Sequence, residues 1–144
     1  MTCAMHQTHR VLVCDDSSVV RAGVQEFLKH EAGIEVVGEA AGGQAGIEAA
    51  IESLPDLVLM DVFMPGVDGI EATREIVARA PSVKVIAYSG ELNWVIVQRM
   101  LEAGARGYVL KQSHLKELAC AMRIVLAGGT FLSPRLMGTV PSHD

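Results

Sequence analysis

Short apolar segments alternate with longer amphipathic segments along the chain. Five apolar runs are rich in Val, Ile and Leu and cover residues 11–14, 34–37, 57–60, 83–88 and 107–110. Such runs predict strands that are buried on both faces of a sheet, and the less apolar second run suits a sheet edge. Apolar residues at helical spacing follow each run and predict helices over about 18–28, 47–54, 70–77, 91–103 and 115–125. Alternating strands and helices predict a parallel sheet with right-handed crossovers and helices on both faces.

Length, composition and charge narrow the class of protein. A chain of 144 residues, half of them hydrophobic and a fifth charged, is ordinary for one globular domain. The net charge of −5 gives no sign of the basic face that binds DNA unaided. Cys3, Cys14 and Cys120 lack metal-ligand spacing and are expected to be free thiols. With no signal peptide and no apolar run of membrane-spanning length, we expect a cytoplasmic protein without a membrane partner.

Polar residues stand at the carboxyl ends of four predicted strands. Asp15 and Asp16 follow the first strand, Asp61 follows the third, Ser89 ends the fourth and Lys111 follows the fifth. In a parallel sheet these ends meet at one edge, which is where ligands bind. Taken alone, each residue is explained as a helix cap, a turn or a solvated surface group. Their shared position instead predicts one functional site.

The chemistry of this predicted site is that of phosphoryl transfer. Three crowded carboxylates repel one another unless protons or a cation neutralise them, and Mg²⁺ is a small cation that prefers oxygen ligands. A carboxylate can also accept a phosphoryl group and form an acyl phosphate. A lysine and a hydroxyl at the same edge would stabilise the phosphoryl oxygens.

The residues at the strand ends lie in segments that resemble the receiver domains of two-component response regulators. The segments are VLVCDDSSVVRAG (11–23), PDLVLMDVFMPGVDGIEA (55–72), VIAYSG (85–90) and AGARGYVLK (103–111). The resemblance implies an α/β, flavodoxin-like or CheY-like fold, with a doubly wound five-stranded parallel sheet in the order 2-1-3-4-5 and five helices in three αβα layers. It covers residues 10–129. Residues 1–9 are then a flexible or disordered N-terminus, and 130–144 a short tail or the start of a linker.

The resemblance also implies which residues accept phosphate and hold metal. Asp61 is the phosphoacceptor. Asp16 binds Mg²⁺ directly and Asp15 supports it largely through water. Asp61 and the backbone carbonyl of Phe63 complete the set of metal ligands. The domain would catalyse only its own phosphorylation and dephosphorylation, so it is not expected to be an enzyme in the usual sense.

Three further residues are implied to respond to the phosphate. Lys111 is the essential lysine, Ser89 the switch hydroxyl and Tyr108 the switch aromatic. Phosphate on Asp61 is expected to pull the Ser89 hydroxyl inward and to let Tyr108 follow into the vacated space. The surface around the fourth helix, the fifth strand and the last helix would change with them.

The subfamily that the sequence resembles is the NarL/FixJ (LuxR-type) group. The segment GGTFLSP (128–134) is typical of the place where a linker to a DNA-binding helix-turn-helix domain begins. The expected function is therefore a switch that a sensor histidine kinase phosphorylates and that controls transcription through an output domain absent from this chain. DNA would be contacted only through that domain, and a phosphorylation-dependent homodimer is a further expected assembly. The alternative is a stand-alone receiver that binds protein partners or serves as a phosphate sink.

Two positions near the acceptor depart from the family pattern. Phe63 stands where a polar or basic residue is frequent, and Gly90 stands where alanine or another small residue is usual. Both are expected to affect the lifetime of the phosphate. Phe63 also argues against an aspartate-nucleophile phosphohydrolase of the haloacid dehalogenase type, because that class needs a second acid two residues after the nucleophile.

Overall fold

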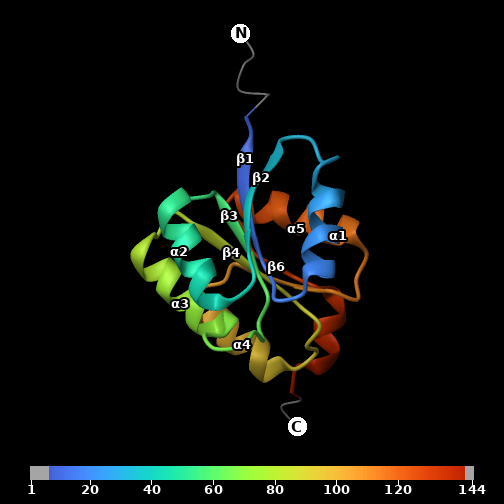
Figure 1. Ribbon diagram of the computed structural model, residues 1–144. Coiled ribbons are helices and arrows are strands. Elements are labelled where there is room, and N and C mark those ends of the chain that lie inside the picture. The colour runs from blue at the N-terminus through green and yellow to red at the C-terminus, as the bar shows by residue number, and fades with distance from the viewer. Residues whose placement is uncertain (1–6, 142–144) are drawn as a thin grey trace.

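The computed structural model describes residues 7–141, which form a six-stranded parallel sheet with helices on both faces (Figure 1). The strands lie in the order β2-β1-β3-β4-β5-β6. Their bounds are β1 His9–Cys14, β2 Ile34–Ala40, β3 Leu57–Met60, β4 Lys84–Ser89, β5 Gly107–Leu110 and β6 Phe131–Leu132. The predicted fold class and the order of the first five strands are confirmed.

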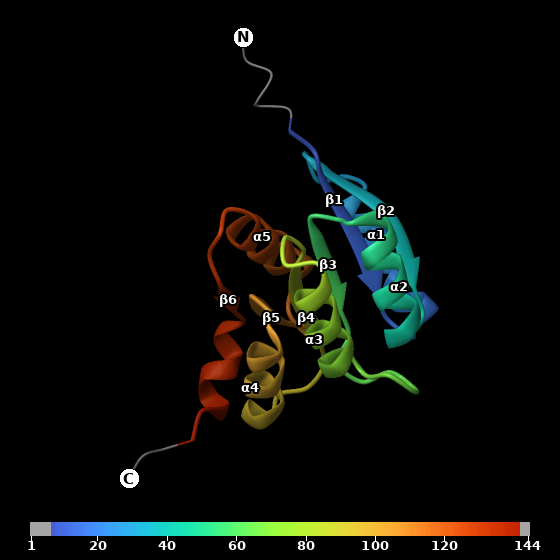
Figure 2. The same cartoon turned by 90° about the vertical axis from the view of Figure 1, so that its left-hand side faces the viewer.

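Five α-helices among the described residues form the two outer layers. Their bounds are α1 Ser18–Leu28, α2 Gly43–Ser53, α3 Gly69–Arg79, α4 Trp94–Ala103 and α5 Leu115–Leu126. Helices α1 and α5 cover one face of the sheet, and α2, α3 and α4 cover the other (Figures 1 and 2). This arrangement is the doubly wound, three-layer fold that alternating strands and helices predict.

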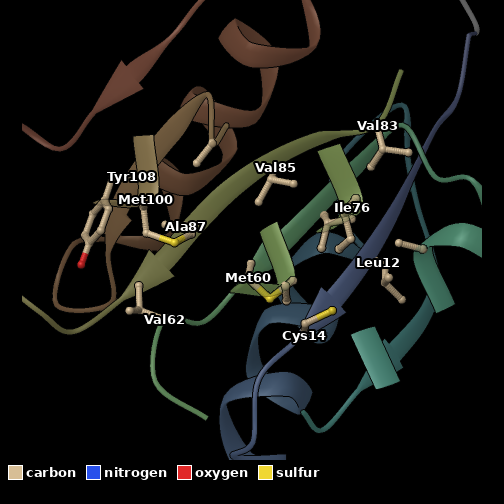
Figure 3. Packing of buried hydrophobic residues seen from close by; sticks show 14 of the residues in the cluster. Leu12, Cys14, Met60, Val62, Ile76, Val83, Val85, Ala87, Met100 and Tyr108 are labelled. Carbon is tan, nitrogen blue, oxygen red and sulfur yellow. The ribbon is translucent and has the colours of Figure 1, made fainter. Parts of the chain in front are cut away.

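The sheet divides the hydrophobic core into two clusters. Successive side chains of a strand point to opposite faces. In β1, Leu12 and Cys14 therefore join the cluster under α2, α3 and α4, while Val11 and Val13 join the cluster under α1 and α5. Figure 3 shows Leu12 and Cys14 in the first cluster, in which Ile76 of α3 also lies. Because both faces of the central strands are buried, their sequences are continuous apolar runs rather than alternating ones.

Among the elements whose bounds differ from the predicted ones, β2 and α4 show the physical reason. Strand β2 has seven residues and extends to Ala40, although its second half is less apolar. Its length is set by pairing with β1, which the hydrophobicity of β2 itself does not reveal. Helix α4 begins at Trp94 rather than near Glu91, because the side chain of Asn93 caps it by accepting a hydrogen bond from the Val95 amide at 2.9 Å.

The segment expected to be a tail or linker adds the sixth strand and a 3-10 helix, η2 (Pro134–Thr139). Strand β6 pairs parallel with β5. The buried Ser133 donates its amide to the Tyr108 carbonyl at 2.9 Å and accepts a hydrogen bond from the Leu110 amide at 3.0 Å through Oγ. Leu136 of η2 is fully buried in the first cluster. A two-residue strand has too little periodicity to be predicted from sequence.

Other expectations concern the N-terminus, the membrane and the thiols. Strand β1 begins at His9, while residues 1–6, including Cys3, lie outside the described part of the chain. Within residues 7–141, no helix combines the length and the apolar character needed to span a bilayer. Cys14 and Cys120 are free thiols, as expected. Burial, together with the negative charge of Asp15, raises the pKa of Cys14 to about 12, so this thiol is unreactive at neutral pH.

Candidate functional site

The acidic residues at the strand ends meet at one edge of the sheet. Asp15, Asp16 and Asp61 each place a carboxylate oxygen within 4.8 Å of the other two. Asp15 and Asp61 are buried and Asp16 is exposed. Strands β1 and β3 are neighbours in which Cys14 pairs with Met60, so the acids that follow them emerge side by side.

Lys111 lies against two of these carboxylates. Its Nζ is 2.7 Å from Asp15 Oδ2 and 3.4 Å from Asp61 Oδ1. Burial by itself would lower the pKa of Lys111, but the two carboxylates outweigh burial and raise its pKa above the ordinary value. The ammonium group therefore stays charged at neutral pH.

The surroundings of Asp61 disfavour its negative charge. Burial, and secondarily the charge of Asp15, raises the pKa of Asp61 from 3.8 to about 6, although Lys111 and the Val62 amide offset part of this effect. The Val62 amide donates to Asp61 Oδ1 at 2.9 Å. The three carboxylates thus carry more negative charge than the single ammonium group of Lys111 neutralises.

The donor set fits a small, hard cation. Its three carboxylates supply oxygen ligands, which Mg²⁺ prefers. Asp15 Oδ2 is buried and close to the lysine ammonium, yet it receives no well-directed hydrogen bond from the described residues. An additional cation would offset both the burial and the charge of Asp15 that raise the pKa of Asp61, and its bound water could donate to Asp15 Oδ2.

A tight loop follows Asp61 and carries Phe63. The Gly69 amide donates to the Val62 carbonyl at 2.7 Å, and a Cβ at Gly69 would lie only 1.9 Å from the Asp61 carbonyl oxygen. Glycine is therefore required at this position, because any Cβ would clash with the backbone of Asp61. The close approach that glycine permits keeps the loop folded against the end of β3. The Phe63 side chain is 50% exposed.

The hydroxyl and the aromatic residue predicted to form a switch share one partner, Glu91. Ser89 is buried, and its Oγ accepts a hydrogen bond from the Glu91 amide at 3.2 Å. The Tyr108 hydroxyl donates to the Glu91 carbonyl at 3.0 Å, and the ring is fully buried. Figure 3 shows Tyr108 among the side chains of the first hydrophobic cluster. The Tyr108 ring is thus packed in the interior beside the loop that carries Glu91.

One residue beside the acidic cluster was not identified from sequence. Arg21 of α1 donates a hydrogen bond from Nη1 to the Asp15 carbonyl at 2.6 Å, and its Nε lies 2.5 Å from Glu39 Oε1. The rule that placed the other site residues considers strand ends, whereas Arg21 lies in a helix. The signal available in the sequence was an arginine, Arg21, five residues after the acid pair Asp15 and Asp16.

A doubly wound sheet with an acid cluster, a lysine and a buried hydroxyl at its carboxyl edge defines a domain of the CheY-like receiver class. The family described as "Response regulator receiver domain" matches residues 11–123, and the chain belongs to this family. The resemblance predicted from the sequence is confirmed.

Relatives refine the assignment. The chain is 42% identical over 127 residues to response regulator GacA of Pseudomonas viridiflava. This match covers 88% of this chain and 59% of GacA. It is 41% identical over 134 residues to the transcriptional regulatory protein LiaR of Bacillus subtilis. This match covers 93% of this chain and 64% of LiaR. The chain is thus a receiver domain of a two-component response regulator of the NarL/FixJ type, and it spans about three-fifths of the length of these relatives.

Solved structures agree with this assignment. A LuxR-family two-component response regulator from Aurantimonas sp. SI85-9A1 superposes with a TM-score of 0.88 at 34% identity, covering 92% of this chain and 95% of that one. The isolated receiver domain of RcsB from Salmonella enterica serovar Typhimurium, in the presence of the phosphomimetic BeF₃⁻, gives a TM-score of 0.86 at 25% identity. That match covers 94% of this chain and 100% of the RcsB domain.

Proposed function

We propose that this domain accepts a phosphoryl group on Asp61 from a sensor histidine kinase, in a Mg²⁺-dependent reaction, and changes its surface to control output. One observation carries the proposal. Asp61 shares a cluster of three carboxylates within 4.8 Å with Asp15 and Asp16, and its Oδ1 lies 3.4 Å from the Lys111 ammonium. This is an acceptor carboxylate with ligands for a cation and a fixed positive charge beside it.

Each acidic residue has a role in holding the cation. Asp16 and Asp61, with the carbonyl of Phe63, would bind Mg²⁺ directly, and Asp15 would support it largely through water. When bound, Mg²⁺ neutralises the carboxylates and the phosphoryl oxygens together. The exposure of Asp16 leaves this side of the cluster open to solvent and to the phosphodonor.

We assign the reaction to Oδ2 of Asp61, because Oδ1 is the oxygen with partners in the protein. Oδ1 is engaged by the Val62 amide and faces Lys111, whereas Oδ2 receives no hydrogen bond from the described residues. Oδ2 would form the bond to phosphorus while the phosphorus–nitrogen bond of the donor phosphohistidine breaks and the imidazole leaves with the electron pair. The Lys111 ammonium and the Ser89 hydroxyl would stabilise the phosphoryl oxygens.

The response to phosphate would be a shift between two packings. The Tyr108 ring lies in the interior and its hydroxyl donates to the Glu91 carbonyl, so phosphorylation would act by favouring this inward packing through Ser89. A coupling of this type amounts to about 1–3 kcal/mol. The affected surface comprises α4, β5 and α5.

Control of transcription is the output that the relatives favour. LiaR is named a transcriptional regulatory protein, and a solved structure of RcsB, 26% identical, shows two dimers bound to two parallel DNAs. The receiver would act through a helix-turn-helix domain outside this chain, which would contact DNA, and phosphorylation would favour a homodimer. The alternative, a stand-alone receiver or phosphate sink, is tested by asking whether the natural reading frame continues past Asp144 into a helix-turn-helix.

The direct test is phosphorylation followed by intact mass. The protein is incubated with acetyl phosphate and Mg²⁺, and it should gain one acid-labile phosphoryl group that chelation of Mg²⁺ prevents. Asp61→Asn should gain none, whereas Glu102→Gln, which removes an exposed carboxylate on α4, should behave as the unsubstituted protein. Phosphorylation of Asp61→Asn under the same conditions would show that the acceptor is another residue.

A further inference from the structure

We infer that Arg21 is a positioning residue for the acidic cluster, because it holds the peptide group that carries Asp16. The inference rests on the proposed function, since it concerns the ability of the cluster to bind Mg²⁺. It adds a residue of the first helix, outside the strand ends, to the parts of the chain on which that binding depends.

The contacts of Arg21 join three elements. Nη1 donates to the Asp15 carbonyl at 2.6 Å, and Nε lies 2.5 Å from Glu39 Oε1 of β2. The Arg21 side chain is only 15% exposed. A guanidinium group is planar and its donors point in fixed directions. Anchoring Nε on β2 therefore fixes the direction in which Nη1 reaches the turn between β1 and α1.

Asp16 is the acid that most needs this support. Asp15 accepts a hydrogen bond from the Ser17 amide at 2.9 Å, and Asp61 accepts one from the Val62 amide at 2.9 Å. The carboxylate of Asp16 is exposed and receives no hydrogen bond from the described residues. Its place in the cluster therefore depends on the backbone that carries it.

The bond made by Arg21 acts on this backbone directly. The Asp15 carbonyl and the Asp16 nitrogen belong to one planar peptide group. Holding the carbonyl oxygen therefore fixes the orientation of that plane, and with it the Cα from which the Asp16 side chain extends. The Asp15 amide is held as well, because it donates to the Ala40 carbonyl at 3.0 Å.

Positioning and simple charge effects predict opposite results. A positive guanidinium close to a cation site repels Mg²⁺, so its removal would tighten binding if charge alone mattered. Loss of a group that orients a metal ligand weakens metal binding instead, by about 10- to 100-fold. The sign of the change in Kd therefore separates the two explanations.

The experiment compares Arg21→Gln and Arg21→Lys with the unsubstituted protein by calorimetric titration with Mg²⁺. Arg74→Gln, which removes a 56% exposed arginine on α3, is the control for loss of a positive charge. Both Arg21 variants should bind Mg²⁺ at least about tenfold more weakly, and the control should bind normally. In EDTA, the amide resonances of Asp16 and Ser17 should shift in the Arg21 variants, which tests positioning without metal.

The outcomes separate the inference from the proposed function. Equal or tighter Mg²⁺ binding by folded Arg21 variants, with normal binding by the unsubstituted protein, would overturn the positioning role alone. Circular dichroism verifies that each variant is folded under the conditions of the titration. A folded variant that is less stable but keeps the Kd of the unsubstituted protein would also overturn the positioning role. If Arg21→Gln does not fold, Arg21→Lys decides the question. Failure of the unsubstituted protein to bind Mg²⁺ would overturn the proposed function and the inference together.

Discussion

Replacement of Asp61 by asparagine should stabilise the metal-free domain at neutral pH. The carboxylate of Asp61 is buried beside Asp15, and this environment raises its pKa from 3.8 to about 6. Asparagine has nearly the same shape and no charge at any pH. The variant therefore removes the unfavourable charge and keeps the packing.

The sign and the size of the effect follow from the raised pKa. A carboxyl group whose pKa is higher in the folded state favours folding at low pH, and that contribution is lost as pH rises through about 6. A difference of about two pKa units corresponds to about 3 kcal/mol above that pH. The advantage of asparagine should therefore be about 3 kcal/mol near pH 7.5 and about 1 kcal/mol near pH 4.5.

The assay is urea denaturation in EDTA at both pH values. Glu102→Gln is the matched control, because it removes an exposed carboxylate and should change the free energy of unfolding by less than about 0.5 kcal/mol. Addition of Mg²⁺ should stabilise the unsubstituted protein more than Asp61→Asn and so narrow the difference. A variant no more stable than the unsubstituted protein near pH 7.5, or a gain that does not shrink in acid, would refute the reasoning.

Substitutions at four other sites, one of them with a matched control, test separate parts of the molecule. Asp16→Ala should weaken Mg²⁺ binding, because a ligand and a charge are lost, and an unchanged calorimetric Kd would contradict its assignment. Ser89→Ala should accept phosphate but show a smaller change in hydrogen exchange over α4 on addition of beryllofluoride; a full response would remove Ser89 from the switch. We expect the half-exposed ring of Phe63, two residues after the acceptor, to exclude the attacking water, so Phe63→Asn and Phe63→Ala should both lose phosphate faster; equal or slower decay would argue against that role. Leu136→Ala should cost about 2–4 kcal/mol in urea denaturation, whereas the exposed Met137→Ala should cost little; equal losses would show that η2 does not pack stably.

The sequence was sufficient to predict the sheet and the acidic edge. Strands buried on both faces are short continuous apolar runs, so the first five strands and their order of appearance were visible without a structure. Parallel strands bring their carboxyl ends to one edge, so a residue that directly follows a strand is placed by topology alone. Asp15, Asp61 and Lys111 were predicted together for this reason, and their contacts confirm that they meet.

Only the tertiary structure decided the contacts between residues that no local pattern connects. Strand β6 is too short to show a periodicity, and its place depends on the free edge of β5. The contact of Arg21 with the Asp15 carbonyl depends on how α1 packs beside β2, and the inward position of Tyr108 depends on the loop that carries Glu91. Local periodicity reports which face of an element is buried. The partner of a side chain depends on the packing of elements distant along the chain, and this leaves no repeating signal in the sequence.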